Sequence, residues 1–349
     1  MNRSKILFFV EQAALALRAG RVVSIKSKNK ELCIISSQTF RKTKTLKPKE
    51  LVITSVRANA IIKQKKSKGN FVLNFDNVVQ SEIKQIIAEN NITPDKKIIK
   101  RLKLAELNKS PIYSAAIKLS KIAEILPSVI VIESSKSDVQ INSEHIDIYD
   151  SEVADNLVPI VTAPLTLQNA KSAEMTIFRA SGGTKEHFAI KIGKVTKNKI
   201  PTVRIHSACF TGDVLASLKC DCREQLQSSI KIMEEEGGGI LLYMNQDGRG
   251  IGLANKLRTY SLQSEGMDTV DANRYIGFDD DERLFLPAAA MLKKMGFKKV
   301  KILTNNPRKI AGLEKCGIKV VKRLDHMGAC NAHNRQYLNT KLSKLGHIK

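Results

Sequence analysis

Three of the six cysteines in this 349-residue chain, Cys209, Cys220 and Cys222, fall within fourteen residues, in the run HSACFTGDVLASLKCDC. Thiolates bind Zn²⁺ tightly, and a short loop that carries three of them can bring all three to one ion. A structural zinc site needs a fourth ligand, whereas three ligands leave a position open for water, so the spacing favours a catalytic zinc. The alternative is that the three cysteines are small buried core residues.

The length of the chain, about twice that of a usual domain, predicts two domains. No stretch is apolar enough for a membrane span. Glu11 and Gln12 interrupt the apolar residues near the start, so we expect no signal peptide and a cytoplasmic protein. Six scattered cysteines do not suggest a disulfide framework, and a reducing compartment would leave the clustered thiols free for a metal.

The formal net charge is +24, and residues 1–100 hold 21 Lys or Arg against 7 Asp or Glu. This charge raises the hypothesis of nucleic-acid binding. Lys outnumbers Arg by 42 to 16, however, Trp is absent and other aromatic residues for base stacking are few. Net charge indicates non-specific attraction, so we expect no specific nucleic-acid partner, whereas an anionic nucleotide substrate would benefit from the field.

The sequence pattern changes near residue 155 and predicts one domain over 1–155 and a second over 156–349. Periodic apolar residues in the first domain predict alternating helices and strands, hence a mixed α/β region. The expected helices cover 8–17 and 115–126, the latter ended by Pro127, and the expected strands cover 21–25, 32–36 and 128–133. The run VPIVTAPLTLQ that follows is predicted to mark the boundary.

Strands and helices also alternate in the second domain, which gives the whole chain a mixed α/β (α+β) fold class. A hairpin is expected around 181–183, and the strand TVRIHS should bring Arg204 and His206 to the cysteine loop. A helix over 224–236 and the strand ILLYM lead to the glycine-rich NQDGRGIGL, whose backbone amides can approach an anion. The strand VKILT runs into NNPRK, a strand-to-helix turn of the kind that binds phosphate.

From about Glu174 to His347 the chain resembles GTP cyclohydrolase II, the zinc enzyme that opens the imidazole ring of GTP at the entry to riboflavin synthesis. The resemblance rests on separated motifs in the order of the family: RIHSACFTGDVLASLKCDCREQL, LLYMNQDGRGIGLANKLRTYSLQ, DTVDAN, IGFDDDER, ILTNNPRKIAGLE and YLNTKLSKLGH. It implies hydrolysis of GTP at C8 with release of formate and pyrophosphate, giving 2,5-diamino-6-(5-phosphoribosylamino)pyrimidin-4(3H)-one. It also implies a homodimer, one zinc ion per subunit and Mg²⁺ on the triphosphate.

The resemblance implies residue roles as well. Cys209, Cys220 and Cys222 match the zinc ligands. Tyr260 matches a tyrosine near the reacting base, Asp281 the proton acceptor, and Arg283 a residue proposed as nucleophile in pyrophosphate release, although a protonated guanidinium suits phosphate clamping better. The positions that match GTP contacts are Arg204, Ile205, His206, Ser207, Ala208, Gln225, Asp247, Gly248, Arg249, Thr269, Thr304 and Lys309.

Three positions depart from the pattern of the family. Ala208 stands where many members have Glu, Asp247 replaces a Glu, and Arg223 fills the place of a frequent Gly. Because the expected ligands and catalytic residues are intact, we expect catalysis to be retained, and the departures bear only on details of the affinity for GTP.

The run EQAALALRAGRVVSI at 11–25 resembles the opening of 3,4-dihydroxy-2-butanone 4-phosphate synthase. The acid-rich Mg²⁺-binding segment of that enzyme should follow, but KSKNKELCIISSQTF stands there, with Lys where carboxylates are needed. The first domain is therefore interpreted as degenerate and non-catalytic, and a fragment starting near Val158 is expected to keep activity if it folds.

Two classes of function remain open. One is a zinc hydrolase acting on GTP, and the other is a zinc-stabilised basic protein that binds nucleic acid. A fourth protein ligand from His206, Cys316 or Cys330 would favour the binding protein, because a closed zinc site is structural.

Overall fold

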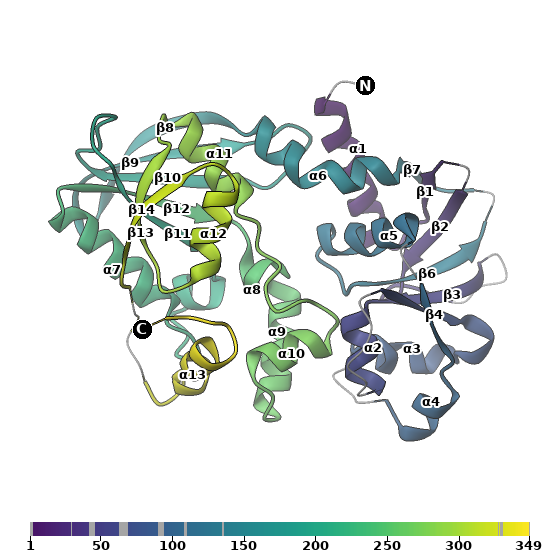
Figure 1. Ribbon diagram of the computed structural model, residues 1–349. Helices are drawn as coiled ribbons and strands as arrows, with labels where there is room; N and C mark the ends of the chain where they lie inside the picture. Colours follow the sequence, from purple (N-terminus) through teal and green to yellow (C-terminus); the bar gives the residue numbers. More distant parts are fainter. Residues whose placement is uncertain are drawn as a thin grey trace. The chain divides into compact units, whose positions relative to one another are not determined.

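The structure is a computed structural model that describes residues 3–28, 30–41, 46–62, 69–89, 94–107, 110–134, 136–326, 328 and 331–348. The chain forms two compact units, each of them α/β (Figure 1). Unit 1 comprises Met1–Tyr149 and Ile251–Glu282, and unit 2 comprises Asp150–Gly250 and Arg283–Lys349. The predicted division at residue 155 lies near the first crossing between the units, but it places 251–282 in the second domain, whereas this segment packs within unit 1.

A seven-stranded mixed sheet forms the centre of unit 1, with the order β5-β4-β3-β6-β2-β1-β7. Its strands are β1 (Val23–Ser27), β2 (Lys30–Ser36), β3 (Lys47–Ile53), β4 (Asn70–Asn74), β5 (Leu104–Leu107), β6 (Ser128–Glu133) and β7 (Val139–Asn142). All pairings are antiparallel except that of β1 with β7. The three strands expected from the sequence are confirmed to within two or three residues.

Helices cover both faces of this sheet. Successive residues of a strand point to opposite sides, and here both sides carry apolar side chains that need to be covered. On β6, Val129 and Val131 pack with one helical layer, while Ile130 and Ile132 pack with the other. The first layer contains α1 (Arg3–Arg18), α5 (Pro111–Ile122) and the start of α6 (Ser143–Asn156). The second contains α2 (Ser55–Ile62), α3 (Gln80–Ile86), α4 (Lys96–Arg101), α9 (Leu253–Ser264) and α10 (Thr269–Tyr275). The short η1 (Phe75–Asn77) precedes α3.

Buried Arg57 on α2 ties the later segment of unit 1 to the earlier one. Its guanidinium donates to the main-chain oxygens of Gln85, Ile86 and Tyr275 at 2.6 to 2.7 Å and lies 4.5 Å from the centroid of the Tyr275 ring. Thr54 also donates to the oxygen of Gly277 at 2.8 Å. Removing residues 1–157 would strip these partners from 251–282, so the structure weighs against folding of the fragment from Val158, the condition on which its expected activity depends.

Unit 2 contains a second seven-stranded mixed sheet, with the order β14-β13-β11-β12-β10-β9-β8. Its strands are β8 (Val158–Leu167), β9 (Ala170–Arg179), β10 (His187–Gly193), β11 (Thr202–Ser207), β12 (Gly238–Met244), β13 (Lys299–Leu303) and β14 (Lys319–Leu324). The hairpin predicted around 181–183 is confirmed by the antiparallel pairing of β9 with β10. The run taken as a boundary is instead the edge strand β8, where Pro159 and Pro164 are tolerated because one side has no strand partner.

The strands β14, β13, β11 and β12 are parallel to one another: β11 pairs with β12 and with β13, and β13 pairs with β14. The helical elements of unit 2 are η2 (Phe210–Val214), α7 (Cys222–Glu235), α8 (Asp247–Gly250), α11 (Leu286–Lys294), α12 (Pro307–Lys315) and α13 (Arg335–Ser343). Ile230 and Met233 of α7 pack on Leu241 of β12, so this helix covers one face of the sheet. Helix α12 packs beside α11 and β14 (Figure 1).

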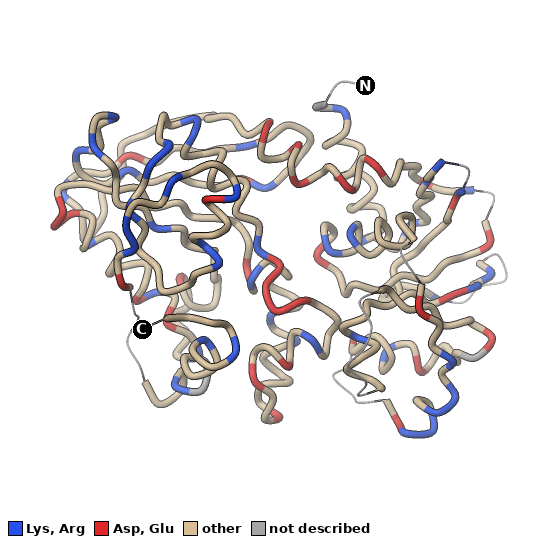
Figure 2. Tube along the Cα trace, in the orientation of Figure 1, with Lys and Arg blue, Asp and Glu red and all other residues tan. Residues whose placement is uncertain are grey.

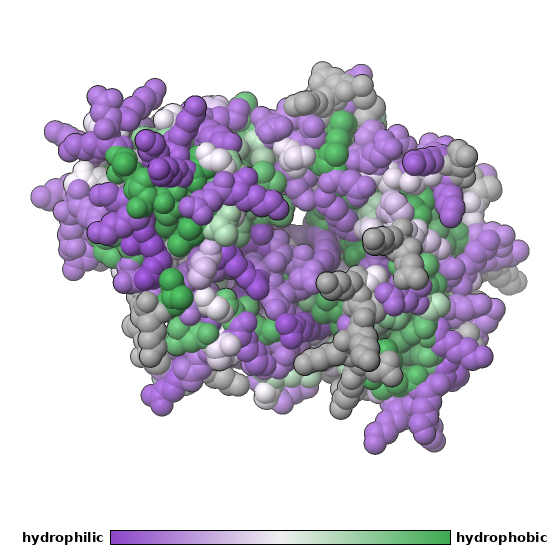
Figure 3. Space-filling view, viewed as in Figure 1, coloured by the Kyte–Doolittle hydropathy of each residue, from purple (hydrophilic) through white to green (hydrophobic). Residues whose placement is uncertain are grey.

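Charged residues recur along both units. In the view of Figure 2, Lys and Arg are spread over each unit with Asp and Glu between them. Hydrophilic residues cover most of the face seen in Figure 3, with smaller apolar areas between them. In the part of the chain that the structure describes, no helix is long and apolar enough to cross a membrane.

Candidate metal and substrate site

The sequence motifs of unit 2 meet at one edge of its sheet. The cysteine loop follows β11, the glycine-rich turn follows β12, and the Thr304 turn follows β13. Since these three strands are parallel neighbours, their carboxyl ends lie side by side. Ligands of open α/β sheets bind at this edge, so the topology explains why motifs far apart in the sequence gather there.

The Sγ atoms of Cys209, Cys220 and Cys222 lie within 4.8 Å of one another, and those of Cys209 and Cys220 are 3.7 Å apart. Tetrahedral coordination with Zn–S bonds near 2.3 Å places sulfur ligands about 3.8 Å apart, so this donor set fits a zinc ion. Cys209 and Cys220 are buried, and Cys222 is half-buried at the first turn of α7. The positive end of that helix favours a thiolate.

Gly212 of η2 packs against the thiol cluster. A Cβ at this position would lie 2.6 Å from Sγ of Cys220 and 3.0 Å from Sγ of Cys209, so a larger residue would push into the cluster. Hydrogen bonding with Cys209, together with burial, raises the pKa of Cys220 to about 11. The same causes raise the pKa of Cys222 well above its ordinary value. Three thiols this close resist ionisation together, and a divalent cation would relieve that repulsion.

Asp213 of η2 holds the start of the cysteine loop. Its carboxylate accepts hydrogen bonds from the Cys209 amide at 3.0 Å, from Nε2 of His206 at 3.1 Å and from the Tyr243 hydroxyl at 2.9 Å. His206 and Tyr243 are partners in the register of β11 and β12, and their rings stack with centroids 5.5 Å apart. Burial lowers the pKa of His206, against the effect of Asp213. This network fixes the loop that presents Cys209.

The glycine-rich turn also contacts the cysteine loop. Oδ2 of Asp247 accepts a hydrogen bond from the amide of Phe210 at 2.9 Å. The next two residues, Gly248 and Arg249, both have left-handed backbone angles, with φ values of 62° and 64°. Arg249 adopts this angle without being glycine, which marks the turn as strained. The sequence predicted an anion-binding loop here, and the structure adds a direct link to the metal-loop backbone.

Two cations expected to contact GTP are buried and hold main-chain oxygens. Arg204 is 4% exposed and donates to the oxygen of Leu303 at 3.0 Å, and Lys309 is 5% exposed and donates to the oxygen of Ile205 at 2.7 Å. Burial lowers the pKa of Arg204 to about 10. These bonds tie β11 to the end of β13 and to α12, a structural role that the sequence did not indicate.

Comparisons with known proteins show the family of this chain. The family model of GTP cyclohydrolase II matches residues 159–325. GTP cyclohydrolase-2 of Azospirillum brasilense is 35% identical over 360 residues, covering 97% of this chain and 93% of that protein. The chain belongs to the GTP cyclohydrolase II family. It is therefore an enzyme of this family, a hydrolase of riboflavin biosynthesis, and the resemblance found in the sequence is confirmed.

Other relatives match about half of the chain. Riboflavin biosynthesis protein RibBA of Thermotoga maritima is 53% identical over 163 residues, 47% of this chain and 41% of that protein. GTP cyclohydrolase-2 of Haemophilus influenzae is 47% identical over 175 residues, half of this chain and 81% of that protein. Among solved structures, the two-domain 3,4-dihydroxy-2-butanone 4-phosphate synthase RibBX of A. baumannii covers 90% of this chain and 99% of its own, with 14% identity and a TM-score of 0.29. A score this low supports no conclusion.

Three residues that match GTP cyclohydrolase II roles lie in unit 1. Tyr260 is half-buried on α9, with Nζ of Lys256 5.9 Å from its ring centroid, and Thr269 begins α10. Asp281 is half-buried in an acidic loop. Its neighbours in that loop are paired: Asp280 with Arg274, and both Asp279 and Glu282 with Lys121.

The remaining residues that match GTP contacts lie in unit 2. Arg249 and Arg283 are half-buried, and Thr304 is buried, with its hydroxyl accepting a hydrogen bond from the Asn306 amide at 3.0 Å. Burial, followed by the positive charges of Lys341, Arg249, Lys309 and Arg283, lowers the pKa of His347 to about 3. Several cations therefore lie around the C-terminal segment. The other members of the set are Ile205 and His206, buried on β11, and the half-buried Ser207, Ala208, Gln225 and Gly248.

The candidates for a fourth zinc ligand separate the two classes of function. In the described part of the chain, the metal-ligating group contains the three cysteines alone. His206 is bonded to Asp213 through Nε2, and Cys316 caps the far end of α12, while Cys330 lies outside the described residues. Among the described residues the set is therefore three cysteines, the number that leaves a position open for water in a catalytic site.

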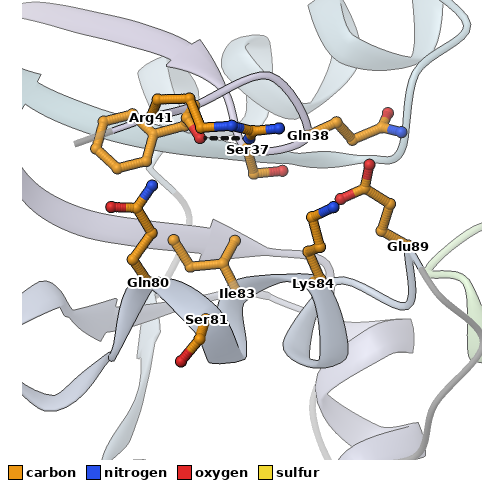
Figure 4. A pocket seen from close by; sticks show the side chains of 9 residues that line it. Ser37, Gln38, Arg41, Gln80, Ser81, Ile83, Lys84 and Glu89 are labelled. Carbon is orange, nitrogen blue, oxygen red and sulfur yellow. Dashed lines mark hydrogen bonds between the residues drawn. The ribbon is translucent and has the colours of Figure 1, made fainter. Parts of the chain in front are cut away.

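Unit 1 contains a shallow cavity of about 270 Å³, seen from close by in Figure 4. Its lining combines Arg41 and Lys84 with polar residues and a single carboxylate, that of Glu89. Ser37 and Gln38 come from the end of the segment that replaces the expected acid-rich run.

Sequence reasoning missed Gly212 and Asp213, and it also missed the buried ion pair in which Nζ of Lys341 lies 2.6 Å from Oδ1 of Asp221, between two of the cysteines. A glycine and an aspartate inside a cysteine loop could have been noticed, since such residues shape turns. No local sequence pattern marks Lys341, because its ion-pair partner Asp221 lies 120 residues earlier in the chain.

Proposed function

We propose that the protein binds one zinc ion through Cys209, Cys220 and Cys222 and hydrolyses GTP at C8 of guanine. Formate and pyrophosphate would be released, leaving 2,5-diamino-6-(5-phosphoribosylamino)pyrimidin-4(3H)-one. The observation that carries this proposal is the buried three-thiol cluster at the carboxyl edge of the parallel strands, in a chain of the GTP cyclohydrolase II family. Zinc supplies Lewis acidity that makes water a nucleophile near neutral pH.

The residues around the cluster would prepare the site for this reaction. Asp213 orients the Cys209 amide, and Asp247 holds that of Phe210, so the loop keeps its shape as substrate binds. We propose that Arg249 and Arg283 bind the triphosphate with Mg²⁺, and that Arg204, Gln225, Thr304 and Lys309 support that surface. The direct contacts to GTP remain predictions for Ile205, His206, Ser207, Ala208, Gly248 and Thr269.

Roles in the chemical steps are proposed for two residues of unit 1. Asp281 would accept a proton and Tyr260 would hydrogen-bond near the reacting base. Arg283 of unit 2 would clamp phosphate in the step that releases pyrophosphate, because a guanidinium stays protonated. Homodimeric assembly and a cytoplasmic location remain predictions from the sequence and the family.

A direct assay tests the proposed reaction. Purified zinc-loaded protein is incubated with GTP and Mg²⁺, and formate, pyrophosphate and the pyrimidine product are quantified. Equal amounts of all three are expected. Pyrophosphate without formate would instead indicate simple hydrolysis of the triphosphate and would contradict ring opening.

We also propose that unit 1 has no 3,4-dihydroxy-2-butanone 4-phosphate synthase activity. The segment from the end of β1 to the start of β2 carries Lys26, Lys28 and Lys30 where carboxylates would be needed. Incubation of the full chain with ribulose 5-phosphate and Mg²⁺ should yield no dihydroxybutanone phosphate. Detection of that product by mass spectrometry would overturn the degenerate interpretation.

A further inference from the structure

A buried ion pair links the C-terminal helix α13 to the cysteine loop. Asp221 stands between two of the thiols, Cys220 and Cys222, and its side chain is 1% exposed. Its Oδ1 accepts a hydrogen bond from Nζ of Lys341 at 2.6 Å, and the lysine side chain is 12% exposed. Helix α13 follows residue 325, where the match to the family model ends.

The pair continues into a network beneath the sheet edge. Oδ2 of Asp221 accepts from Nε2 of Gln225 at 2.6 Å, and Oε1 of Gln225 accepts from the guanidinium of Arg204. Arg204 in turn holds the oxygen of Leu303 at the end of β13. A displacement of Asp221 would therefore act on both neighbouring thiols and on a buried cation of β11.

The chain at Gly328 also packs against Asp221. A Cβ at Gly328 would lie 2.6 Å from Cβ of Asp221 and 2.8 Å from its Oδ2, so the chain covers this carboxylate closely. A buried carboxylate is costly unless a cation compensates it. Lys341 supplies that cation.

Helix α13 is held in place at its C-terminal end. The His347 amide donates to the oxygen of Lys341 at 3.1 Å, and the Ile348 amide donates to that of Asn305 at 3.0 Å. Leu345 is buried. The end of the chain thus returns to the turn after β13, which fixes the position from which Lys341 reaches the cysteine loop.

We propose that Lys341 is a positioning residue for the metal site: through Asp221 it holds the turn that presents Cys220 and Cys222. Lys341 touches neither the metal nor the substrate in this account. The inference rests on the proposed three-cysteine zinc site. Partners that orient metal ligands from outside typically change metal affinity ten- to a hundredfold when removed.

The test measures how fast zinc leaves the holoenzyme to an excess of EDTA. Lys341→Met should release zinc about tenfold faster than the wild type. Lys231→Met is the matched control, because Lys231 forms an exposed pair with Glu235 on α7 of the same unit, at 3.9 Å. This control should release zinc at the wild-type rate.

A double-variant cycle separates positioning from two independent effects. Asp221→Asn should release zinc about as fast as Lys341→Met, and the double variant should be no faster than the faster single one. The double variant removes both charges, so it also serves if Lys341→Met alone does not fold. Multiplied effects of the two substitutions would overturn the proposal.

Cobalt provides a reading of site geometry that a general loss of stability would not change. In Co²⁺-substituted protein, Lys341→Met should shift the d–d bands, while Lys341→Arg, which keeps the charge, and Lys231→Met should not. Wild-type zinc release and an unchanged Co²⁺ spectrum in Lys341→Met would refute the positioning role alone. A wild-type protein that binds no zinc would refute the proposed function as well.

Discussion

Units 1 and 2 both build a seven-stranded mixed sheet, but they bury different side chains around it. The sheet of unit 1 carries apolar residues on both faces, and its strands are mostly antiparallel. The sheet of unit 2 brings the carboxyl ends of parallel strands together and places thiols, carboxylates and cations there. Strand direction, and not sheet size, therefore decides where a chain like this can bring functional side chains together.

Buried cations show the same contrast. Arg57 in unit 1 donates to main-chain oxygens of three residues and joins segments far apart in the sequence. Lys341 and Arg204 in unit 2 lead through Asp221 and Gln225 to the cysteine loop. In unit 1 the buried charge supports packing, whereas in unit 2 it supports a site.

The largest effect is expected from the thiols of unit 2. Cys220→Ser removes one of three proposed protein ligands, so zinc content should fall to near zero and formate release should be lost by at least about a thousandfold. Metal analysis and the GTP assay measure both. Cys316→Ser, outside the cluster, is the control and should keep zinc and activity. Normal zinc content in Cys220→Ser would break the assignment of chemistry to unit 2.

The next effect concerns packing in unit 1. Arg57→Met leaves the main-chain oxygens of Gln85, Ile86 and Tyr275 without this donor, which should cost about 3–5 kcal/mol of local stability. Hydrogen exchange by mass spectrometry should show faster exchange in α2, α3 and α10, with the cysteine loop unchanged. Arg101→Met is the control, because Arg101 is 46% exposed. Equal exchange in α10 of wild type and Arg57→Met would contradict the linking role.

A smaller, pH-dependent effect is expected from His187 in unit 2. Burial, with a contribution from Lys185, lowers its pKa to about 4, and its Nδ1 accepts a hydrogen bond from the Asn245 amide at 3.1 Å. The unfolded chain, with a pKa near 6.5, binds this proton first as pH falls. Stability is therefore complete above about pH 6.5 and is lost as pH falls towards 4, by up to about 3 kcal/mol.

His187→Gln keeps an acceptor but cannot titrate in this range. Urea unfolding of unit 2, followed between pH 7 and 4, should show a shallower loss of stability in the variant than in the wild type. Parallel pH profiles would mean that His187 does not contribute to the acid sensitivity.

The smallest effect is expected from one methyl group added beside the thiols of unit 2. Gly212→Ala places a Cβ against two thiols, so zinc release to EDTA should accelerate about tenfold. Gly312→Ala is a matched control, since its Cβ would meet the Phe285 ring at 2.4 Å, a clash that does not involve the cysteines. It should lower stability without changing the Co²⁺ spectrum. Identical behaviour of the two variants would remove the special role of Gly212.

Local sequence patterns predicted most elements of the fold. The β-branched runs SVIVIE and TVRIHS became β6 and β11, because such residues fit a buried sheet. The helix expected over 115–126 covers Pro111–Ile122, since Glu124 turns left-handed, with φ of 55°, before Pro127 can act. The edge strand β8 was missed because the run was interpreted as a domain boundary, and only the sheet order reveals that it forms an edge strand.

The candidate site was predicted in part for similar reasons. The spacing of three cysteines is local, so the sequence alone predicted their convergence. The roles of Asp213 and Lys341 depend on which strands and helices become neighbours, and a single sequence does not encode that locally. The packing of 251–282 in unit 1 was missed because apolar residues such as Leu262 and Phe278 indicate a buried face without indicating its partner.

Zinc K-edge X-ray absorption of the purified wild-type protein tests the central claim most directly, because it counts the ligands of the bound metal. The account predicts one zinc per chain with three sulfur ligands at about 2.3 Å and one oxygen ligand at about 2.0–2.2 Å. It also predicts no outer-shell scattering of the kind that an imidazole gives. Four sulfur ligands, or three sulfurs with a histidine, would contradict it, because a closed site has no position for water.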